Sequence, residues 1–280
     1  MSQQVITTEL CEWITEQSRV GHASETILAA MLGSGWDEGI ARQALARVLG
    51  QAATLTAPPG ARTALPEPDL SRFAPVIDAG DRQVKVVMAL RQPRVVVFAD
   101  MLSDEECDGI IALAAKRLAR SETVATGSDG SEVNAARTSD GMFFDRCETE
   151  LIRRVESRIA TLLRWPLDHG EGLQVLRYRP GAEYQPHYDY FDPAHVGTPG
   201  ILKRGGQRVG TLVIYLNTPE AGGSTIFPDI GLDVAPVKGH AVFFSYDRPH
   251  PSTQTLHGGS PVIAGEKWVA TKWLRQGVFN

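Results

Sequence analysis

The chain has 280 residues, which is long enough to bury a substantial core without disulfides or metals as staples. Its 28 Lys and Arg residues against 33 Asp and Glu residues give a formal net charge of −5, and the absence of a basic cluster excludes a typical nucleic-acid binder. No apolar run approaches the ~18 residues of a membrane span, and the first residues lack the basic and apolar regions of a signal peptide.

Residues 1–50 carry apolar side chains at three- and four-residue steps, the spacing of amphipathic helices. Gly21 and Gly35 mark helix ends, whereas Ser24 and Asp37 mark helix starts. This layout predicts three short helices and resembles a small ubiquitin-associated-like module, which would bind a protein partner. A plain structural or dimerising extension is the alternative interpretation.

Residues 51–83 interrupt this periodicity with closely spaced prolines and glycines. We therefore expect a linker that is extended and stiffened by proline. The third region, residues 84–280, begins with β-branched runs instead of closely spaced prolines and is predicted to form the second domain.

The second domain begins with two β-branched runs, Val84–Leu90 and Arg94–Phe98, which predict strands. Ser103 and Glu106 form a capping box at the start of a helix, and a second helix is expected from Thr149 to Leu163. Six further strands are predicted: Leu173–Tyr178, Gln185–Tyr190, Val209–Leu216, Ser224–Phe227, Ala241–Ser245 and Lys267–Leu274. Short strands after two helices favour an α+β fold, with a closed or two-sheet β core and helices packed outside.

The segment Gln185–Tyr190 reads Gln-Pro-His-Tyr-Asp-Tyr and carries a candidate metal site. Side chains two apart on a strand point to the same face, so His187 and Asp189 would present an imidazole and a carboxylate side by side. One more histidine would complete the two-histidine, one-carboxylate set that is typical of non-haem Fe(II) oxygenases. Of the seven histidines, His257 is the candidate, although His250 also lies near it in the sequence.

Lys267 begins the last predicted strand, ten residues after His257. Alternation along this strand puts Lys267 on one face with Thr271 and Trp273. A lysine that faces a β core needs an anion as its partner, and a dicarboxylic co-substrate bound to the metal would supply one. A solvent-facing lysine on an edge strand is the alternative.

Five sequence blocks resemble those of prolyl 4-hydroxylases in their order and spacing. The first runs from Leu173 to Asp189 and includes Tyr-Arg-Pro-Gly-Ala-Glu-Tyr-Gln-Pro-His-Tyr-Asp. The others are Gly205–Asn217, Gly222–Pro228, Lys238–Phe244 and the block with His257, Lys267 and Trp273. The resemblance covers residues 94–276 and implies a double-stranded β-helix (jelly-roll) dioxygenase that depends on Fe(II) and 2-oxoglutarate.

The resemblance also implies a role for each matching residue. The iron ligands would be His187, Asp189 and His257. Lys267 would pair with the distal carboxylate of 2-oxoglutarate, and Tyr178 would hydrogen-bond it. Thr211 and Trp273 would line the same pocket, and no catalytic residue beyond the metal centre is implied.

The implied reaction is similar to that of procollagen-proline 4-dioxygenase. A peptidyl proline would be hydroxylated with O2, 2-oxoglutarate would be released as succinate and CO2, and ascorbate would act as reductant. Arg137 and Tyr184 would lie at the groove for a proline-containing protein or peptide. Two alternatives stay open: a hydroxylase of a free amino acid or other small molecule, and a non-catalytic metal-binding barrel that is recruited through the N-terminal helices.

The three cysteines, Cys11, Cys107 and Cys147, show neither metal-ligand spacing nor a disulfide framework. This pattern fits a reducing compartment, so we expect a cytoplasmic protein without membrane or nucleic-acid partners.

Overall fold

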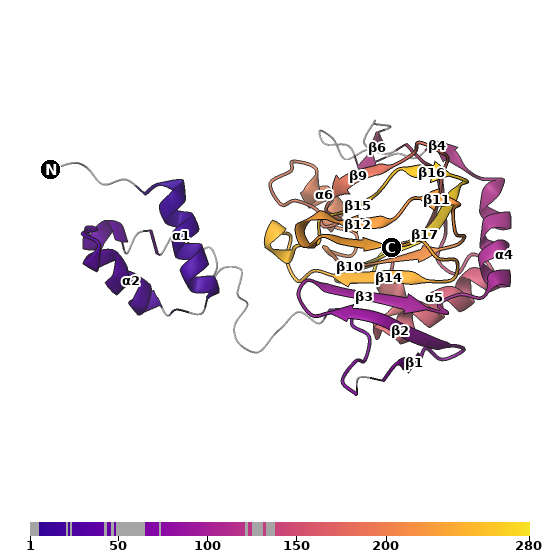
Figure 1. The fold of residues 1–280 in the computed structure, drawn as a ribbon, viewed down its shortest axis with the longest axis horizontal. Coiled ribbons are helices and arrows are strands. Elements are labelled where there is room, and N and C mark those ends of the chain that lie inside the picture. Colours follow the sequence, from indigo (N-terminus) through magenta and orange to yellow (C-terminus); the bar gives the residue numbers. More distant parts are fainter. Residues whose placement is uncertain are drawn as a thin grey trace. The chain divides into compact units, whose positions relative to one another are not determined.

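The structure, a computed structural model, separates the chain into two compact units, Met1–Ala64 and Leu65–Asn280 (Figure 1). The residues it describes are 6–20, 22, 24–41, 44–45, 48, 65–72, 74–120, 123–124, 131–132 and 138–280. None of the helices within these ranges is both long enough and apolar enough to cross a membrane.

The first unit contains helices α1 (Thr8–Arg19) and α2 (Ser24–Gly33), and residues 38–41 are also helical. The Thr7 side chain accepts a hydrogen bond from the backbone N–H of Leu10 and so caps α1. Asp37 accepts the backbone N–H groups of Gly39 and Ile40, as its predicted place at a helix start requires. The apolar faces meet in a small core: Leu10, Ile14, Ile27, Met31, Ala41, Ala44 and Leu45. A ubiquitin-associated-like role for this unit stays a prediction.

The second unit is built on a nine-stranded antiparallel sheet (Figure 1). In spatial order its strands are β1 (Val76–Asp78), β2 (Gln83–Leu90), β3 (Arg94–Ala99), β14 (Ala241–Ser245), β10 (Arg208–Tyr215), β17 (Lys267–Arg275), β8 (Leu173–Tyr178), β7 (Asp140–Phe144) and β4 (Ala119–Arg120). A four-stranded sheet is made of β13 (Leu232–Val234), β12 (Thr225–Phe227), β15 (His257–Gly259) and β9 (Tyr184–His187). Two short pairs complete the strands: β11 (Ala221–Gly222) with β16 (Val262–Ala264), and β5 (Thr123–Val124) with β6 (Ser131–Glu132).

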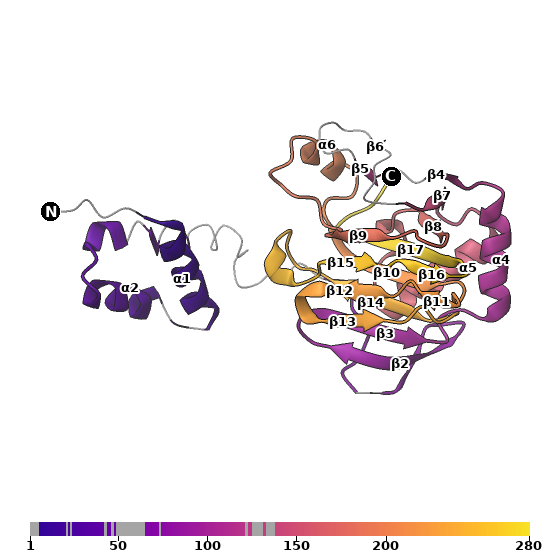
Figure 2. The same ribbon diagram turned by 45° about the horizontal axis from the view of Figure 1, so that its top comes forward.

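The larger sheet has a different partner on each face. Helices α4 (Asp104–Ala115) and α5 (Glu150–Leu163) pack on one face, where Ile110, Ile159 and Phe243 share a core. The four-stranded sheet covers the other face (Figure 2). Phe227 and Phe244 meet between the sheets. Helix α6 (Thr198–Leu202) and 3-10 turns at Leu167–His169, Pro228–Ile230 and Pro251–Thr253 lie in the connections. This α+β jelly-roll architecture confirms the predicted fold class.

Local signals in the sequence predict the helix starts well. Ser103 and Glu106 form both hydrogen bonds of the capping box, and Thr149 caps α5 through the backbone N–H of Ile152. The predicted linker differs from the structure in its second half. Leu65, Leu70 and Ile77 pack against the helix-side core, and β1 lies inside the range predicted as linker.

The predicted strand Gln185–Tyr190 extends beyond the observed one, since β9 runs from Tyr184 to His187. Its neighbour β15 begins at His257, directly opposite His187, so the residues after His187 have no strand of that sheet to pair with. Asp189 therefore lies just beyond the strand rather than on it.

Candidate active site

A cavity lies between the two sheets and collects nearly all of the residues that the sequence singles out. Its lining is Leu176, Tyr178, Tyr184, His187, Asp189, Thr211, Val213, Thr225, His257, Gly258, Gly259, Lys267, Val269, Thr271 and Trp273. The alternation along β17 explains the last four residues, because every second side chain of that strand faces the cavity.

His187, Asp189 and His257 form a tight cluster in this cavity. Their possible ligand atoms all lie within 4.8 Å of one another. His187 Nε2 is 3.5 Å from Asp189 Oδ1, and His257 Nε2 is 3.4 Å from Asp189 Oδ2. The two histidines are cross-strand neighbours in the β9–β15 pair, which brings residues 70 positions apart in the chain together.

Each histidine is oriented by a backbone carbonyl. Nδ1 of His187 lies 3.0 Å from the Gln185 carbonyl oxygen, and Nδ1 of His257 lies 2.9 Å from that of Thr255. A carbonyl oxygen only accepts, so Nδ1 carries a proton in both rings, and each ring turns its Nε2 toward Asp189. This second hydrogen bond is the usual way of fixing a metal-binding imidazole.

The charge state of the cluster favours a bound cation. Burial is the main cause that lowers the pKa of His187, followed by the nearby charge of His257. Burial alone would raise the pKa of Asp189, but the interactions with His257 and His187 outweigh it and hold the pKa well below its usual value. A buried carboxylate that faces two imidazole nitrogens needs a positive charge among them, and these nitrogen and oxygen donors suit Fe(II).

Gly258 allows the close approach of the two ligand-bearing strands. A Cβ atom at this position would lie 2.8 Å from the Tyr184 carbonyl oxygen and 3.1 Å from the backbone nitrogen of Pro186. Both atoms belong to backbone that cannot easily move. The glycine after His257 is therefore part of the geometry that brings His257 to His187.

Lys267 is buried in the same cavity, with 4% of its surface exposed. It lies opposite Tyr178 in the β17–β8 pair, and its Nζ is 5.4 Å from the Tyr178 ring centre and 5.9 Å from that of Tyr215. In the part of the chain that the structure describes, no acidic side chain forms an ion pair with it. Burial lowers the pKa of Lys267 to about 8, so the site favours an anionic ligand.

Thr211 contacts the metal cluster directly. Its hydroxyl donates to Asp189 Oδ2 over 2.7 Å, and it is fully buried. The sequence predicts Thr211 in the co-substrate pocket, and it does line the cavity, but its hydrogen bond is made to the carboxylate. Trp273 also lines the cavity, and its buried Nε1–H has no acceptor among the described residues.

Of the two residues predicted to contact the substrate, Tyr184 and Arg137, the structure describes only Tyr184. The ring of Tyr184 stacks on that of His187, with 3.8 Å between centres and 25° between planes. This places Tyr184 at the metal cluster. Arg137 lies outside the described residues.

Sequence reasoning missed a partly buried group beside the cluster. Arg208 forms an ion pair with Glu171, lies 4.0 Å over the Trp273 ring, and directs Nη1 at the Asp189 carbonyl oxygen over 3.4 Å. Thr225, a second missed residue, lines the cavity and accepts a hydrogen bond from the Tyr215 hydroxyl. Both lie in blocks quoted for the family resemblance, at Gly205–Asn217 and Gly222–Pro228, which was the available signal.

Comparisons with known proteins agree with this geometry. The sequence model of the 2OG-Fe(II) oxygenase superfamily matches residues 173–275, which include all three members of the cluster and Lys267. Probable prolyl 4-hydroxylase 3 of Arabidopsis thaliana is 39% identical over 210 residues, covering 68% of this chain and 71% of the relative. Prolyl 4-hydroxylase 1 of the same plant is 40% identical over 228 residues, covering 74% of this chain and 79% of the relative.

A solved structure is similar as well. The viral collagen prolyl hydroxylase of Paramecium bursaria Chlorella virus-1, in its 2OG complex, aligns with a TM-score of 0.50 and 31% identity. The alignment covers 65% of this chain and 94% of the viral protein.

Proposed function

Since the chain belongs to the prolyl 4-hydroxylase family of 2OG-Fe(II) oxygenases, we propose that it hydroxylates a peptidyl proline and releases succinate and CO2. It is a 2-oxoglutarate-dependent dioxygenase. One observation carries the proposal: a buried lysine that has no acidic partner among the described residues lines the same cavity as a two-histidine, one-carboxylate cluster. A dicarboxylate that also binds a metal fits both features.

His187, Asp189 and His257 would hold Fe(II). When bound, the metal would activate O2 together with 2-oxoglutarate, which is the oxidative chemistry that side chains alone do not supply. The protein's own contribution is orientation, because the two Nδ1 hydrogen bonds and the Thr211 hydroxyl fix all three ligands before any metal enters.

Lys267 would pair with the distal carboxylate of 2-oxoglutarate, and Tyr178 and Thr225 line the cavity near it. Burial raises the strength of this ion pair, since the lysine is removed from water before the co-substrate arrives. The Trp273 Nε1–H, which has no acceptor among the described residues, is a further donor in the same cavity. These donors would hold the co-substrate in one orientation and exclude water from the reacting atoms.

The prolyl substrate is inferred from the relatives, several of which are named prolyl 4-hydroxylases. Tyr184, which stacks on His187, would support the substrate beside the metal, and Arg137 would contribute to the groove. We also propose ascorbate as reductant, a protein partner for the N-terminal helices and a cytoplasmic location. The free cysteines Cys11, Cys107 and Cys147 support a reducing compartment.

The test is succinate formation by the purified chain with Fe(II), 2-oxoglutarate and ascorbate. Proline-containing peptides, free proline and no substrate are run in parallel, with mass analysis of each product. The expected result is peptide-dependent succinate together with one added oxygen on a proline residue.

Other outcomes would contradict parts of the proposal. Oxidation of free proline but not of any peptide would replace the peptide substrate by a small molecule. Slow succinate release that no proline compound stimulates would keep the metal and co-substrate assignments and exclude proline as the target. No succinate from iron-loaded protein would overturn the enzymatic function.

A further inference from the structure

Thr211 and Tyr246 form a chain of hydroxyl groups that ends on Asp189. The Thr211 hydroxyl donates to Asp189 Oδ2 over 2.7 Å, and the same oxygen lies 3.0 Å from the Tyr246 hydroxyl. Tyr246 is 2% exposed and Thr211 is fully buried, so water does not compete for these bonds. Both residues lie away from β9 and β15, the strands that carry the two histidines. Thr211 lies on β10, and Tyr246 directly follows β14.

The chain has a fixed direction. An ionised carboxylate only accepts, so the single Thr211 hydroxyl proton is used on Asp189. The Thr211 oxygen can then only accept from Tyr246. Burial raises the pKa of Tyr246 well above its usual value, and the charge of Asp189 adds to this, so the phenol keeps the proton that it donates.

The surroundings of Tyr246 hold its ring in place. Its backbone N–H donates to the Val209 carbonyl oxygen, which joins it to β10. Its ring contacts Phe244 at 6.3 Å and Tyr190 at 6.2 Å between centres. A backbone hydrogen bond to β10 and two ring contacts therefore position the Tyr246 hydroxyl beside Thr211, directly after the end of β14.

We propose that Tyr246 is a positioning residue of the metal centre, which acts through Thr211 to fix the Asp189 carboxylate in its metal-binding orientation. The inference rests on the proposed function only in that the cluster binds a metal. A hydrogen-bonded outer partner typically contributes ~10–100-fold to metal affinity. Polarised hydroxyl chains of this kind act as a unit, so the two contributions are not additive.

The same barrel offers a matched control. The Tyr215 hydroxyl donates to Thr225 Oγ1 over 2.8 Å, and Tyr215 is fully buried. This is also a buried tyrosine–threonine bond, but it runs from β10 to β12 and does not reach Asp189. Tyr215→Phe therefore removes the same kind of bond without touching the proposed chain.

The experiment measures the Kd for Mn(II), a redox-silent probe, from the loss of the free-ion paramagnetic resonance signal. We expect Tyr246→Phe and Thr211→Val each to raise this Kd by roughly tenfold. Thr211→Ser, which keeps the hydroxyl, and Tyr215→Phe should stay near the wild-type Kd. The double variant Thr211→Val/Tyr246→Phe should match Thr211→Val alone, because Tyr246 acts only through Thr211. Thermal unfolding in EDTA confirms that each variant folds.

Two results would overturn the inference alone: a wild-type Kd for Tyr246→Phe, or an equal effect of Tyr246→Phe with and without Thr211. In both cases His187→Ala still abolishes Mn(II) binding, so the proposed metal centre survives. If the wild-type protein does not bind Mn(II), or binds it equally well after His187→Ala, the metal centre and the inference fail together.

Discussion

The two faces of the nine-stranded sheet bury charged side chains in opposite ways. On the helix-covered face, Lys272 of β17 forms an ion pair with Glu156 of α5, and both are buried. On the cavity face of the same strand, Lys267 has no acidic partner among the described residues. The first lysine is paired within the protein itself, whereas the partner proposed for the second is the carboxylate of the co-substrate. Buried charge alone thus does not identify a functional site; of these two lysines, the one that lines the cavity is the one without an acidic partner among the described residues.

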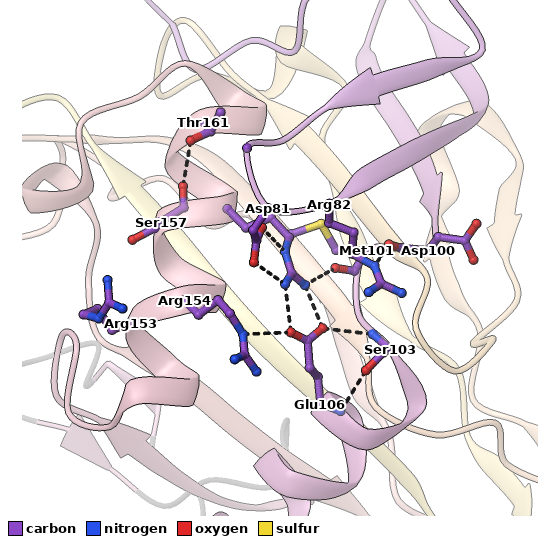
Figure 3. Close-up of polar contacts among 12 residues, drawn as sticks. Asp81, Arg82, Asp100, Met101, Ser103, Glu106, Arg153, Arg154, Ser157 and Thr161 are labelled. Carbon is purple, nitrogen blue, oxygen red and sulfur yellow. Dashed lines mark hydrogen bonds and ion pairs between the residues drawn. The ribbon is translucent and has the colours of Figure 1, made fainter.

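The helix layer contains a second self-sufficient cluster around Arg158 of α5 (Figure 3). Its guanidinium forms two bonds to Asp81, two to Glu106 and one to the Met101 carbonyl oxygen, at 2.7–2.8 Å. All five N–H donors are therefore used. The cluster joins α4, α5 and the turn between β1 and β2, and leaves no donor for a ligand.

The largest effect is expected on activity, from a substitution in the metal-binding cluster of the cavity. His187→Ala removes one of three metal-binding groups, so peptide-dependent succinate release should fall below detection. The protein should still fold, because His187 lies at the end of a short strand. His250→Ala is the matched control, since His250 is an exposed histidine whose ring bonds to nearby Ser252. Full turnover after His187→Ala would mean that the cluster is not the metal site.

The next largest effect is expected from the self-sufficient cluster around Arg158. Arg158→Met leaves Glu106 buried without its main partner, which typically costs about 3–5 kcal/mol of unfolding free energy. Urea unfolding measures this loss. The Kd for Mn(II) of the folded variant should equal that of the wild type, because the cluster lies on the other side of the sheet from the cavity. A change in metal affinity as large as that of Tyr246→Phe would break the distinction between the two faces.

The fold was largely predictable because its strongest signals are local. The capping box at Ser103 and the β-branched runs of β10 and β17 indicate their structure within a few residues. The short strands β7 and β15 were missed because their existence depends on partners far away in the chain. For example, Gly141 in β7 pairs with Leu176, and its own sequence, Asp-Gly-Met-Phe-Phe, contains no strong strand signal.

The two buried lysines of β17 should respond in opposite ways to replacement by methionine. Lys267→Met removes an unpaired cation whose lowered pKa corresponds to a cost of about 3 kcal/mol at pH 7, so the variant should unfold at a higher temperature. Its KM for 2-oxoglutarate should rise more than tenfold. Lys272→Met should instead lower the unfolding temperature, because it leaves Glu156 buried and unpaired.

Equal destabilisation by both substitutions would show that Lys267 has a protein partner and a structural role. An unchanged KM in Lys267→Met, measured under saturating peptide and iron, would remove Lys267 from the co-substrate site.

The candidate site was predictable only where its residues follow a local pattern. His187 and Asp189 lie two residues apart, and Lys267 follows His257 by ten residues within one block of the family resemblance. Thr211 and Tyr246 are 35 residues apart, and Arg208 and Glu171 are 37 apart. Only the pairing of β10 with β14 and β17 brings such groups together, so their contacts follow from topology and not from spacing.

The smallest effect is a pH dependence set by Lys267. The pKa of about 8 in the folded protein lies below the ordinary lysine value, so the folded state releases this proton at lower pH than the unfolded state.

Loss of this proton has opposite effects on activity and on stability. The kcat/KM for 2-oxoglutarate should fall about tenfold per pH unit above pH 8, because the free enzyme loses the cation that binds the carboxylate. Over the same range, from pH 8 to about 10.4, the unfolding free energy of the metal-free protein should gain a rising contribution as the buried charge disappears. Lys267→Met should lack both trends, whereas Lys272→Met should keep them. If kcat/KM stays level from pH 7 to 9.5 in the wild type, the cation at the cavity is already paired, and the contrast between the two faces of the sheet does not hold.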